Sequence, residues 1–338
     1  MHLMGWSATS VLLPADHLNY LSGNRAIKPV EGSWFEFRHH NAAEGKYWDP
    51  TLAGFSCDQW DRKIREMADA GIKYLVLLGI ALDGKTFYPS SHLPQHATGC
   101  HDPLETVLSA ADGYGIRFFI GNDFFGDWTN VGLMMQDSAI HALRVKAMQE
   151  VAEKYGRHKS FYGWYFPNET AVDGYFRDFF ISYVNACSEV AARLTPSAKT
   201  LIAPYGTRLV KPDDRYVKQL EQLNVDFIAY QDEVGVDKTR VEESAGFFRN
   251  LSRAHEKAGR ARLWADVEIF TFEGEIYKSA LVPAPPERVI AQLEAVSPYV
   301  DKIFIYQYIG LVNKPGTDIF AGHPESSRLY ERLFRKKQ

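Results

Sequence analysis

Gly163-Trp164-Tyr165-Phe166-Pro167-Asn168-Glu169 is a hydrophobic segment that stops at a carboxylate. Its three consecutive aromatic residues are typical of a strand that is covered on both faces. Pro167 cannot donate a backbone hydrogen bond, so strand pairing should end there. Residues 262–268 have the same form and also end in an acid. Parallel strands that close into a barrel would bring these two distant strand ends to one face.

Six further segments predict strands, and amphipathic segments predict helices between them. The strands are expected at 33–37, 74–78, 117–121, 200–204, 226–230 and 303–308. Helices are expected at about 56–70, 102–115, 137–155, 175–194, 238–257, 286–300 and 324–335. This alternation predicts an α/β fold with parallel strands, a (β/α)8 TIM barrel over residues 32–338.

Residues 1–31 are interpreted as a short N-terminal extension, in which 11–13 could form an extra strand or a plug. The competing architecture is a doubly wound open sheet. Such a sheet normally carries a glycine-rich phosphate turn after its first strand, and this chain has none there. We therefore expect the closed barrel.

Composition excludes several classes of partner. The chain has 338 residues, 46% of them hydrophobic and 14% aromatic, with a net charge of −4. That balance indicates neither a nucleic-acid partner nor a membrane surface, and no apolar run is long enough for a membrane helix. The start of the sequence lacks a signal-peptide pattern, which predicts a cytoplasmic protein, with a secreted protein after leader removal as the alternative. The oligomeric state stays open.

Cysteine and histidine spacing predicts neither a disulfide framework nor a metal site. Cys57, Cys100 and Cys187 are odd in number and widely spaced, so we expect free thiols. His92, His96 and Cys100 have helical spacing, but a proline and a glycine interrupt that segment. We expect no metal and no cofactor. A metal-dependent hydrolase nevertheless remains one alternative function.

Glu169 and Glu268 are the candidate catalytic pair. Two carboxyl groups that face each other across a cleft are the equipment for cleaving a glycosidic bond. The Asn168-Glu169 pair on the fourth strand and Glu268 on the seventh resemble the clan A glycoside hydrolases. More narrowly, residues 230–235 and 264–268 resemble a family of glycoside-hydrolase-like barrels long labelled a domain of unknown function. The resemblance covers about residues 32–310.

The resemblance implies a retaining glycoside hydrolase that acts on a carbohydrate substrate. It implies that Glu169 is the acid/base and Glu268 the nucleophile. It also implies that Asn168 binds the sugar 2-hydroxyl and that Tyr230 lies beside Glu268 and orients it. Many clan members carry a tryptophan at the end of strand eight, where this chain has residues 306–308, so the sugar is left open.

Other polar and aromatic residues near strand ends are candidate substrate ligands. They are Trp34, Glu36, Asn122, Gln231, Asp232, Asp266 and Tyr306. Asp266 shares the strand face of Glu268, because alternate residues of a strand point the same way. The alternatives are that the polar residues cap loops and the aromatic ones cover the barrel mouth. A barrel that binds a carbohydrate without cleaving it would use the same pocket.

Overall fold

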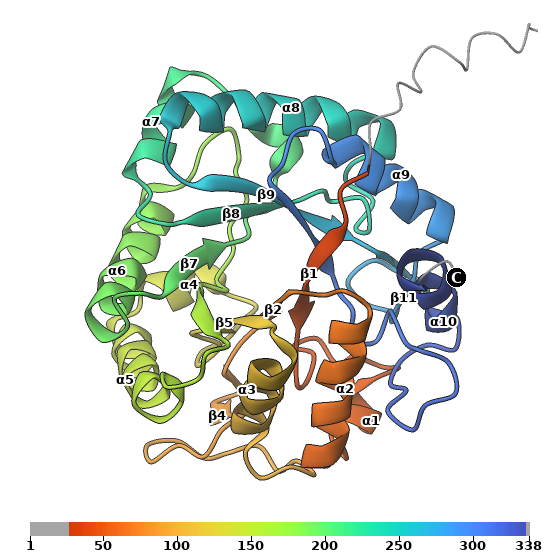
Figure 1. The fold of residues 1–338 in the computed structure, drawn as a ribbon. Helices are drawn as coiled ribbons and strands as arrows, with labels where there is room; N and C mark the ends of the chain where they lie inside the picture. The colour runs from red at the N-terminus through yellow and green to blue at the C-terminus, as the bar shows by residue number, and fades with distance from the viewer. Residues whose placement is uncertain (1–26, 336–338) are drawn as a thin grey trace, which may run out of the picture.

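Eight parallel strands close into a barrel in the computed structural model, which describes residues 27–335. The closed barrel confirms the predicted fold class. Neighbouring strands follow the order β1-β12-β9-β8-β7-β6-β5-β2 around it (Figure 1). Their bounds are β1 (Val30–Phe35), β2 (Tyr74–Leu77), β5 (Arg117–Gly121), β6 (Phe161–Tyr165), β7 (Lys199–Ile202), β8 (Phe227–Gln231), β9 (Arg262–Glu268) and β12 (Lys302–Tyr306). β1 begins two residues before the predicted start of the barrel, and the candidate plug at 11–13 lies outside the described residues.

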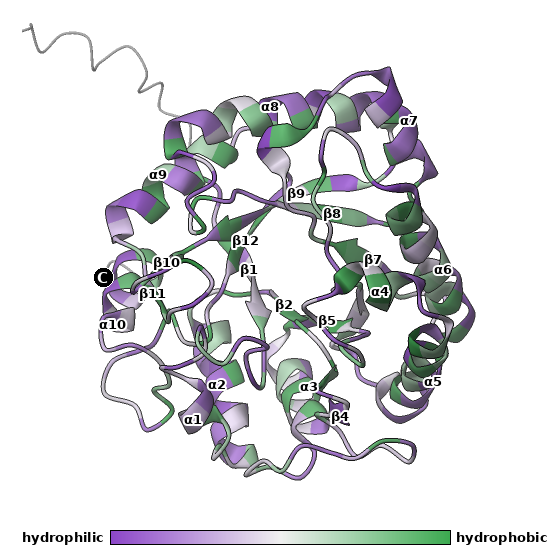
Figure 2. Ribbon diagram, turned by 180° about the vertical axis from the view of Figure 1, so that it is seen from behind, coloured by the Kyte–Doolittle hydropathy of each residue, from purple (hydrophilic) through white to green (hydrophobic). Residues whose placement is uncertain are grey.

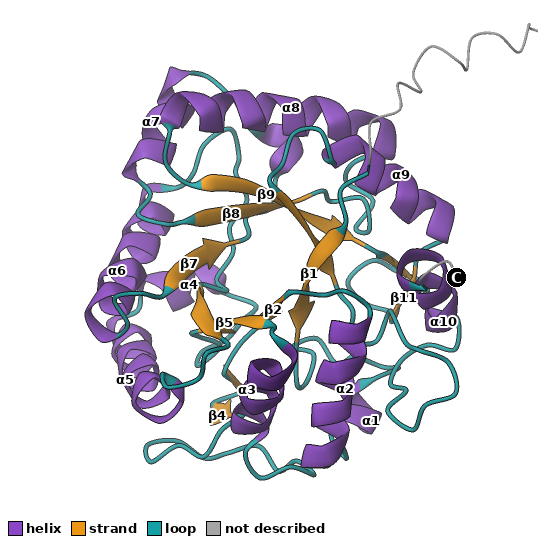
Figure 3. Ribbon diagram, viewed as in Figure 1, coloured by secondary structure: helices purple, strands orange, loops and turns teal. Residues whose placement is uncertain are grey.

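Helices surround the strands on the outside of the barrel (Figure 3), except for the short helix at Val131–Gln136, whose Met134 packs with the residues inside the barrel. They are α1 (Asp49–Leu52), α2 (Cys57–Asp69), α3 (Pro103–Tyr114), α4 (Val131–Gln136), α5 (Ser138–Tyr155), α6 (Asp178–Leu194), α7 (Asp214–Gln222), α8 (Val241–Ala258), α9 (Pro286–Val296) and α10 (Ser326–Leu329), which a π-helical turn at Tyr330–Phe334 continues. Ser56, Asp102 and Asp137 cap α2, α3 and α5 through their side chains, as the sequence predicts. The predicted helices include no counterpart of α7, which has only nine residues.

Two layers of side chains fill the protein. Inside the barrel, Trp264 stacks on Phe227 with ring centroids 4.1 Å apart and packs on Phe304 at 4.7 Å. Trp34 lies in the same cluster, against Tyr165 and Phe304. A second and larger core separates the outer face of the strands from the helices. Figure 2 shows hydrophobic and hydrophilic residues alternating along the surrounding helices. This pattern is expected of helices that cover the outer face of the strands with one side and meet solvent with the other.

A disulfide joins Cys57 to Cys100, so the prediction that both are free thiols is wrong. The long segment after β2 returns to the start of α2 and places the two residues together. Sequence spacing could not reveal this, because the pairing depends on how a loop closes. Cys187 is free and buried on α6.

Two small hairpins were not predicted. β3 (Ala81–Leu82) pairs with β4 (Lys85–Thr86), and β10 (Phe270–Phe272) pairs with β11 (Leu281–Pro283). The second hairpin follows β9 directly, so it lies at the carboxyl end of the barrel strands. Its residues help to form the pocket described next.

Candidate active site

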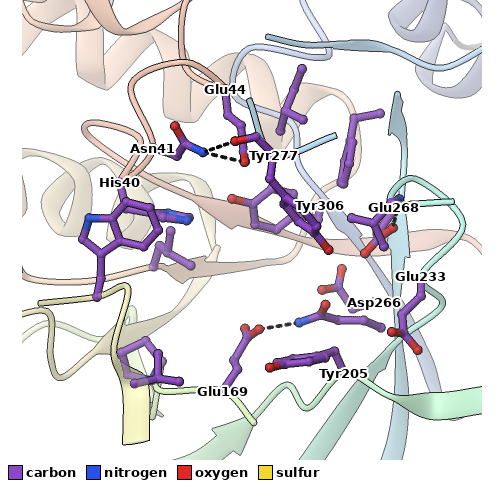
Figure 4. A pocket seen from close by; sticks show the side chains of 18 of the residues that line it. His40, Asn41, Glu44, Glu169, Tyr205, Glu233, Asp266, Glu268, Tyr277 and Tyr306 are labelled. Carbon is purple, nitrogen blue, oxygen red and sulfur yellow. Dashed lines mark hydrogen bonds between the residues drawn. The ribbon is translucent and has the colours of Figure 1, made fainter. Parts of the chain in front are cut away.

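A pocket of about 620 Å³ opens at the carboxyl end of the barrel strands (Figure 4). Residues that follow each of several strands line it, which is the usual site of function in this fold. The lining comprises His40, Asn41, Glu44, Leu78, Phe124, Trp128, Thr129, Val131, Pro167, Glu169, Tyr205, Gln231, Glu233, Val236, Lys238, Asp266, Glu268, Phe270, Phe272, Tyr277, Leu281 and Tyr306. Five of the predicted site residues are among them.

Glu169 enters the pocket just beyond β6. The Tyr165 hydroxyl donates a hydrogen bond to its Oε1 at 2.7 Å, and Gln231 Nε2 donates one to its Oε2 at 2.6 Å. Removal from solvent raises the pKa of this carboxyl group to about 7, although the two hydrogen bonds act in the opposite direction. Glu169 can therefore hold a proton near neutral pH, as a general acid must.

Glu268 and Asp266 share the inward face of β9, as predicted, and both are buried. The backbone N–H of Val236 donates a hydrogen bond to Glu268 Oε2 at 2.9 Å. Burial, followed by the charge of Asp232, raises the pKa of Glu268 well above its ordinary value. Burial and the nearby acids raise the pKa of Asp266 in the same direction. The pocket therefore gathers more carboxyl groups than can all be charged together.

The alternation of side chains along each strand separates the predicted residues that enter the pocket from those that do not. Glu169, Gln231, Asp266, Glu268 and Tyr306 have the inward phase and line the cavity. Tyr230 has the outward phase, so the expectation that it orients Glu268 is wrong. Its hydroxyl bonds the hydroxyl of Tyr216 at 2.6 Å and His255 Nε2 at 3.2 Å, in the core between barrel and helices.

Asn168 and Asn122 also point outward, and neither lines the pocket. Asn168 Nδ2 donates to Asp123 Oδ2 at 2.6 Å, and Asp123 also accepts a hydrogen bond from Arg144. Asn122 is buried, with Nδ2 3.4 Å from Met148 Sδ. The predicted contact of Asn168 with a sugar hydroxyl therefore does not fit its position, and both residues instead join the strands to the helix layer.

Asp232, Glu36 and Trp34 support the pocket from behind, although they were predicted to bind substrate. Asp232 accepts hydrogen bonds from Gln292 Nε2 at 2.7 Å and from the backbone N–H of Glu268 at 3.1 Å. Trp34 lies deeper in the barrel, in the cluster with Phe304. None of the three lines the pocket.

Glu36 is enclosed in a polar network under the loop that follows β1. It accepts hydrogen bonds from Trp48 Nε1 at 2.8 Å and Gln307 Nε2 at 2.7 Å. His39 bridges Glu36 and Glu44 through its two ring nitrogens. Burial alone would lower the pKa of His39, but the two carboxylates outweigh it and raise the pKa to about 10. His39 is thus a cation that holds the loop in place.

Some pocket residues were not predicted. Glu233 follows β8, and Tyr277 reaches the cavity from the connection between β10 and β11. Lys238 Nζ lies 5.4 Å from the ring centroids of both Tyr205 and Tyr277, and so joins two sides of the rim. Figure 4 shows Tyr277 and Tyr205 on different sides of the cavity. Loop residues of this kind have no periodic signal, so only the tertiary structure reveals them.

Neither a metal cluster nor a membrane span is found within residues 27–335. No three or more histidine, cysteine, aspartate or glutamate side chains of this range are arranged to hold a metal ion. His96 packs its ring against Phe87, and Cys100 is in the disulfide. No helix of the same range has the length and apolar character to cross a bilayer.

Comparison with known proteins gives one family and several solved structures. The model of a family described as Domain of unknown function (DUF4434) matches residues 30–318. No curated protein matches the chain.

A solved structure of a candidate alpha-L-fucosidase from Bacteroides thetaiotaomicron has a TM-score of 0.72 at 17% identity, with 98% of each chain covered. The endo-1,4-beta-mannanase from Rhizomucor miehei has a TM-score of 0.57 at 10% identity, covering 91% of this chain and 93% of that one. The beta-galacturonidase from Eisenbergiella tayi has a TM-score of 0.55 at 13% identity, covering 92% of this chain and 51% of that one. These likenesses show a shared barrel fold.

Proposed function

We propose that this chain, which belongs to the family described as Domain of unknown function (DUF4434), is a retaining glycoside hydrolase. The observation that carries the proposal is the position of Glu169 and Glu268, which extend from different barrel strands into one pocket. Aromatic side chains on the rim, including Trp128 and Tyr205, could stack on the apolar faces of a sugar. The solved structures with the same barrel that are named as glycosidases support the same class of reaction.

In the first step, a carboxylate oxygen of Glu268 attacks the anomeric carbon of the bound sugar. The bond from that carbon to the leaving oxygen breaks, and Glu169 gives its proton to this oxygen. The hydrogen bond from Val236 occupies Glu268 Oε2 and holds the side chain in one orientation. Oε1 is then the oxygen that we assign to the attack.

In the second step, Glu169 acts as a base. It takes a proton from a water molecule whose oxygen attacks the anomeric carbon, and the ester bond to Glu268 breaks. The sugar leaves with its original configuration. Because Glu169 must begin the cycle protonated, and its pKa is about 7, kcat should fall as the pH rises above neutrality.

A screen of aryl glycosides and oligosaccharides tests the proposal. The parent protein should cleave a member of the set, and Glu268→Gln should not. Tyr230→Phe is a matched control, since this buried residue lies outside the pocket, and it should retain the parent's activity. Failure of the parent on every substrate, with the sugars bound but intact, would instead support a carbohydrate-binding barrel.

Azide distinguishes the two carboxyl groups. Glu268→Gly should turn over an activated substrate only with added azide, giving a glycosyl azide of inverted configuration. Glu169→Ala should give the retained azide, because the ester on Glu268 still forms. Near-parental rates in both variants would contradict the assignment, and an inverted first product from the parent would contradict the retaining mechanism.

The disulfide bears on where the protein works. Disulfides persist in oxidising compartments and are rare in the cytosol, whereas the start of the sequence predicted a cytoplasmic protein. We propose an oxidising compartment, on the basis of the Cys57–Cys100 bond. When the protein is isolated from its source under denaturing conditions with an alkylating agent present at lysis, mass spectrometry should find one alkylated cysteine. Three alkylated cysteines would contradict this location.

A further inference from the structure

Asp266 differs from Glu169 and Glu268 in its lack of hydrogen-bond partners. The residue is 2% exposed, and Oδ1 has no hydrogen-bond partner. By contrast, Glu169 accepts hydrogen bonds at both oxygens, and Glu268 accepts one from a backbone N–H. Fixed donors stabilise the charged form of a carboxyl group. Of these three, Asp266 is therefore the group whose charge the protein stabilises least.

The surroundings of Asp266 add negative charge from several elements. Glu268 lies on the same strand, and Glu169 extends from β6; Figure 4 shows the Asp266 carboxyl group in the cavity with both of them around it. The segment after β8 contributes Asp232 behind the pocket and Glu233 within it. Tyr306 of β12 also faces the cavity. A negative charge on Asp266 would therefore be repelled by the ionised carboxyl groups around it.

The cations near the pocket do not balance these acids. Among the described lining residues, Lys238 is the only lysine or arginine, and it is held between two rim tyrosines. Arg288 donates hydrogen bonds to the backbone carbonyls of Glu268 and Phe270 and to the side-chain amide of Gln292, and none to a carboxylate. Burial and the charge of His39 lower the pKa of His40, which makes this residue neutral. Burial, then Glu268, then Glu169 raise the pKa of Asp266 well above its ordinary value.

We propose that Asp266 stays protonated in the resting protein and binds the sugar as a hydrogen-bond donor, which leaves the charge of the Asp266–Glu268 pair on Glu268. The protonated carboxyl group of Asp266 would donate this hydrogen bond to an uncharged oxygen of the sugar, such as that of a hydroxyl group. The same proton removes a repulsion that would otherwise oppose ionisation of the nucleophile. The inference rests on the proposed function for its role in binding, but the protonation of Asp266 can be measured without any substrate.

Infrared spectroscopy of isotopically labelled protein locates the proton. At pH 9, Glu169 with a pKa of about 7 and Asp232 with a pKa of about 6 are ionised. A protonated-carboxyl band should remain in the substrate-free protein, and 13C in the aspartate carboxyl groups should shift it. Asp266→Asn should abolish the band. A band that instead shifts with 13C in the glutamate carboxyl groups would place the proton on Glu268 and overturn the proposal.

Two substitutions test the role in binding. Asparagine keeps a donor at the same place without a charge, so Asp266→Asn should keep kcat/KM within a few-fold of the parent. Asp266→Ala removes the donor and should lower kcat/KM about 10- to 100-fold, the effect of losing one buried hydrogen bond. Equal losses in both variants would overturn the donor role. A parent with no glycosidase activity, but with the aspartate band present, would refute the proposed function and leave the protonation intact.

Discussion

Glu169→Gln should make the stability of the protein less sensitive to pH. In the folded protein the Glu169 carboxyl group has a pKa of about 7, against an ordinary value of 4.5. A raised carboxyl pKa stabilises the folded state fully below the unfolded value, and this stabilisation is lost as the pH rises to the folded value. Glutamine has no titrating proton, so the stability of the variant lacks this dependence on pH.

The size of the effect follows from these two values, which are 4.5 and about 7. Relative to a group that does not titrate, this carboxyl group lowers the unfolding free energy by about 0.8 kcal/mol at pH 5 and by about 3.4 kcal/mol at pH 8.5. The difference in unfolding free energy, variant minus parent, should therefore grow by about 2.5 kcal/mol across this range. Exchanging the hydrogen bonds of Tyr165 and Gln231 for those of an amide adds a term that does not change with pH.

Urea unfolding followed by tryptophan fluorescence, at half-unit steps from pH 5 to 8.5, measures this growth. Glu242→Gln is the control, because this exposed residue near the start of α8 changes the charge by the same amount. Its difference from the parent measures the effect of removing an exposed carboxylate. A Glu169→Gln difference that changes with pH no more than this control would refute the reasoning, since the buried pocket would then not perturb its carboxyl group.

Three further outcomes are expected. Cys57→Ser should lower the unfolding free energy by about 4 kcal/mol, from the loop of 43 residues that the disulfide closes, and a reductant should destabilise the parent but not this variant. Tyr230→Phe should lower it by about 1–3 kcal/mol because buried partners lose a hydrogen bond, and urea unfolding at pH 7 measures this loss. Trp264→Ala should lower it by about 3–5 kcal/mol through the cavity left beside Phe227, whereas an unchanged urea midpoint would contradict the stacked barrel core.

Much of the fold could be predicted from the chain because its signals are local. The aromatic run before Glu169 and the similar run before Glu268 mark buried strands, and Ser56 and Asp102 mark helix starts. Such features depend on residues a few positions apart, so one sequence is enough to find them. The same reasoning found that Glu268 ends its strand and that Glu169 follows the end of another.

The order of strands and helices and the acids near two strand ends therefore follow from the sequence alone. Which alternate residues face the cavity depends on the tertiary structure, which places Gln231 inside and Asn168 and Tyr230 outside. Side chains alternate between the two faces of a strand. When both faces are buried, both sets of residues are hydrophobic, so the sequence does not show which set points into the barrel. The Cys57–Cys100 bond also belongs to tertiary structure, because it depends on loop closure over a long separation.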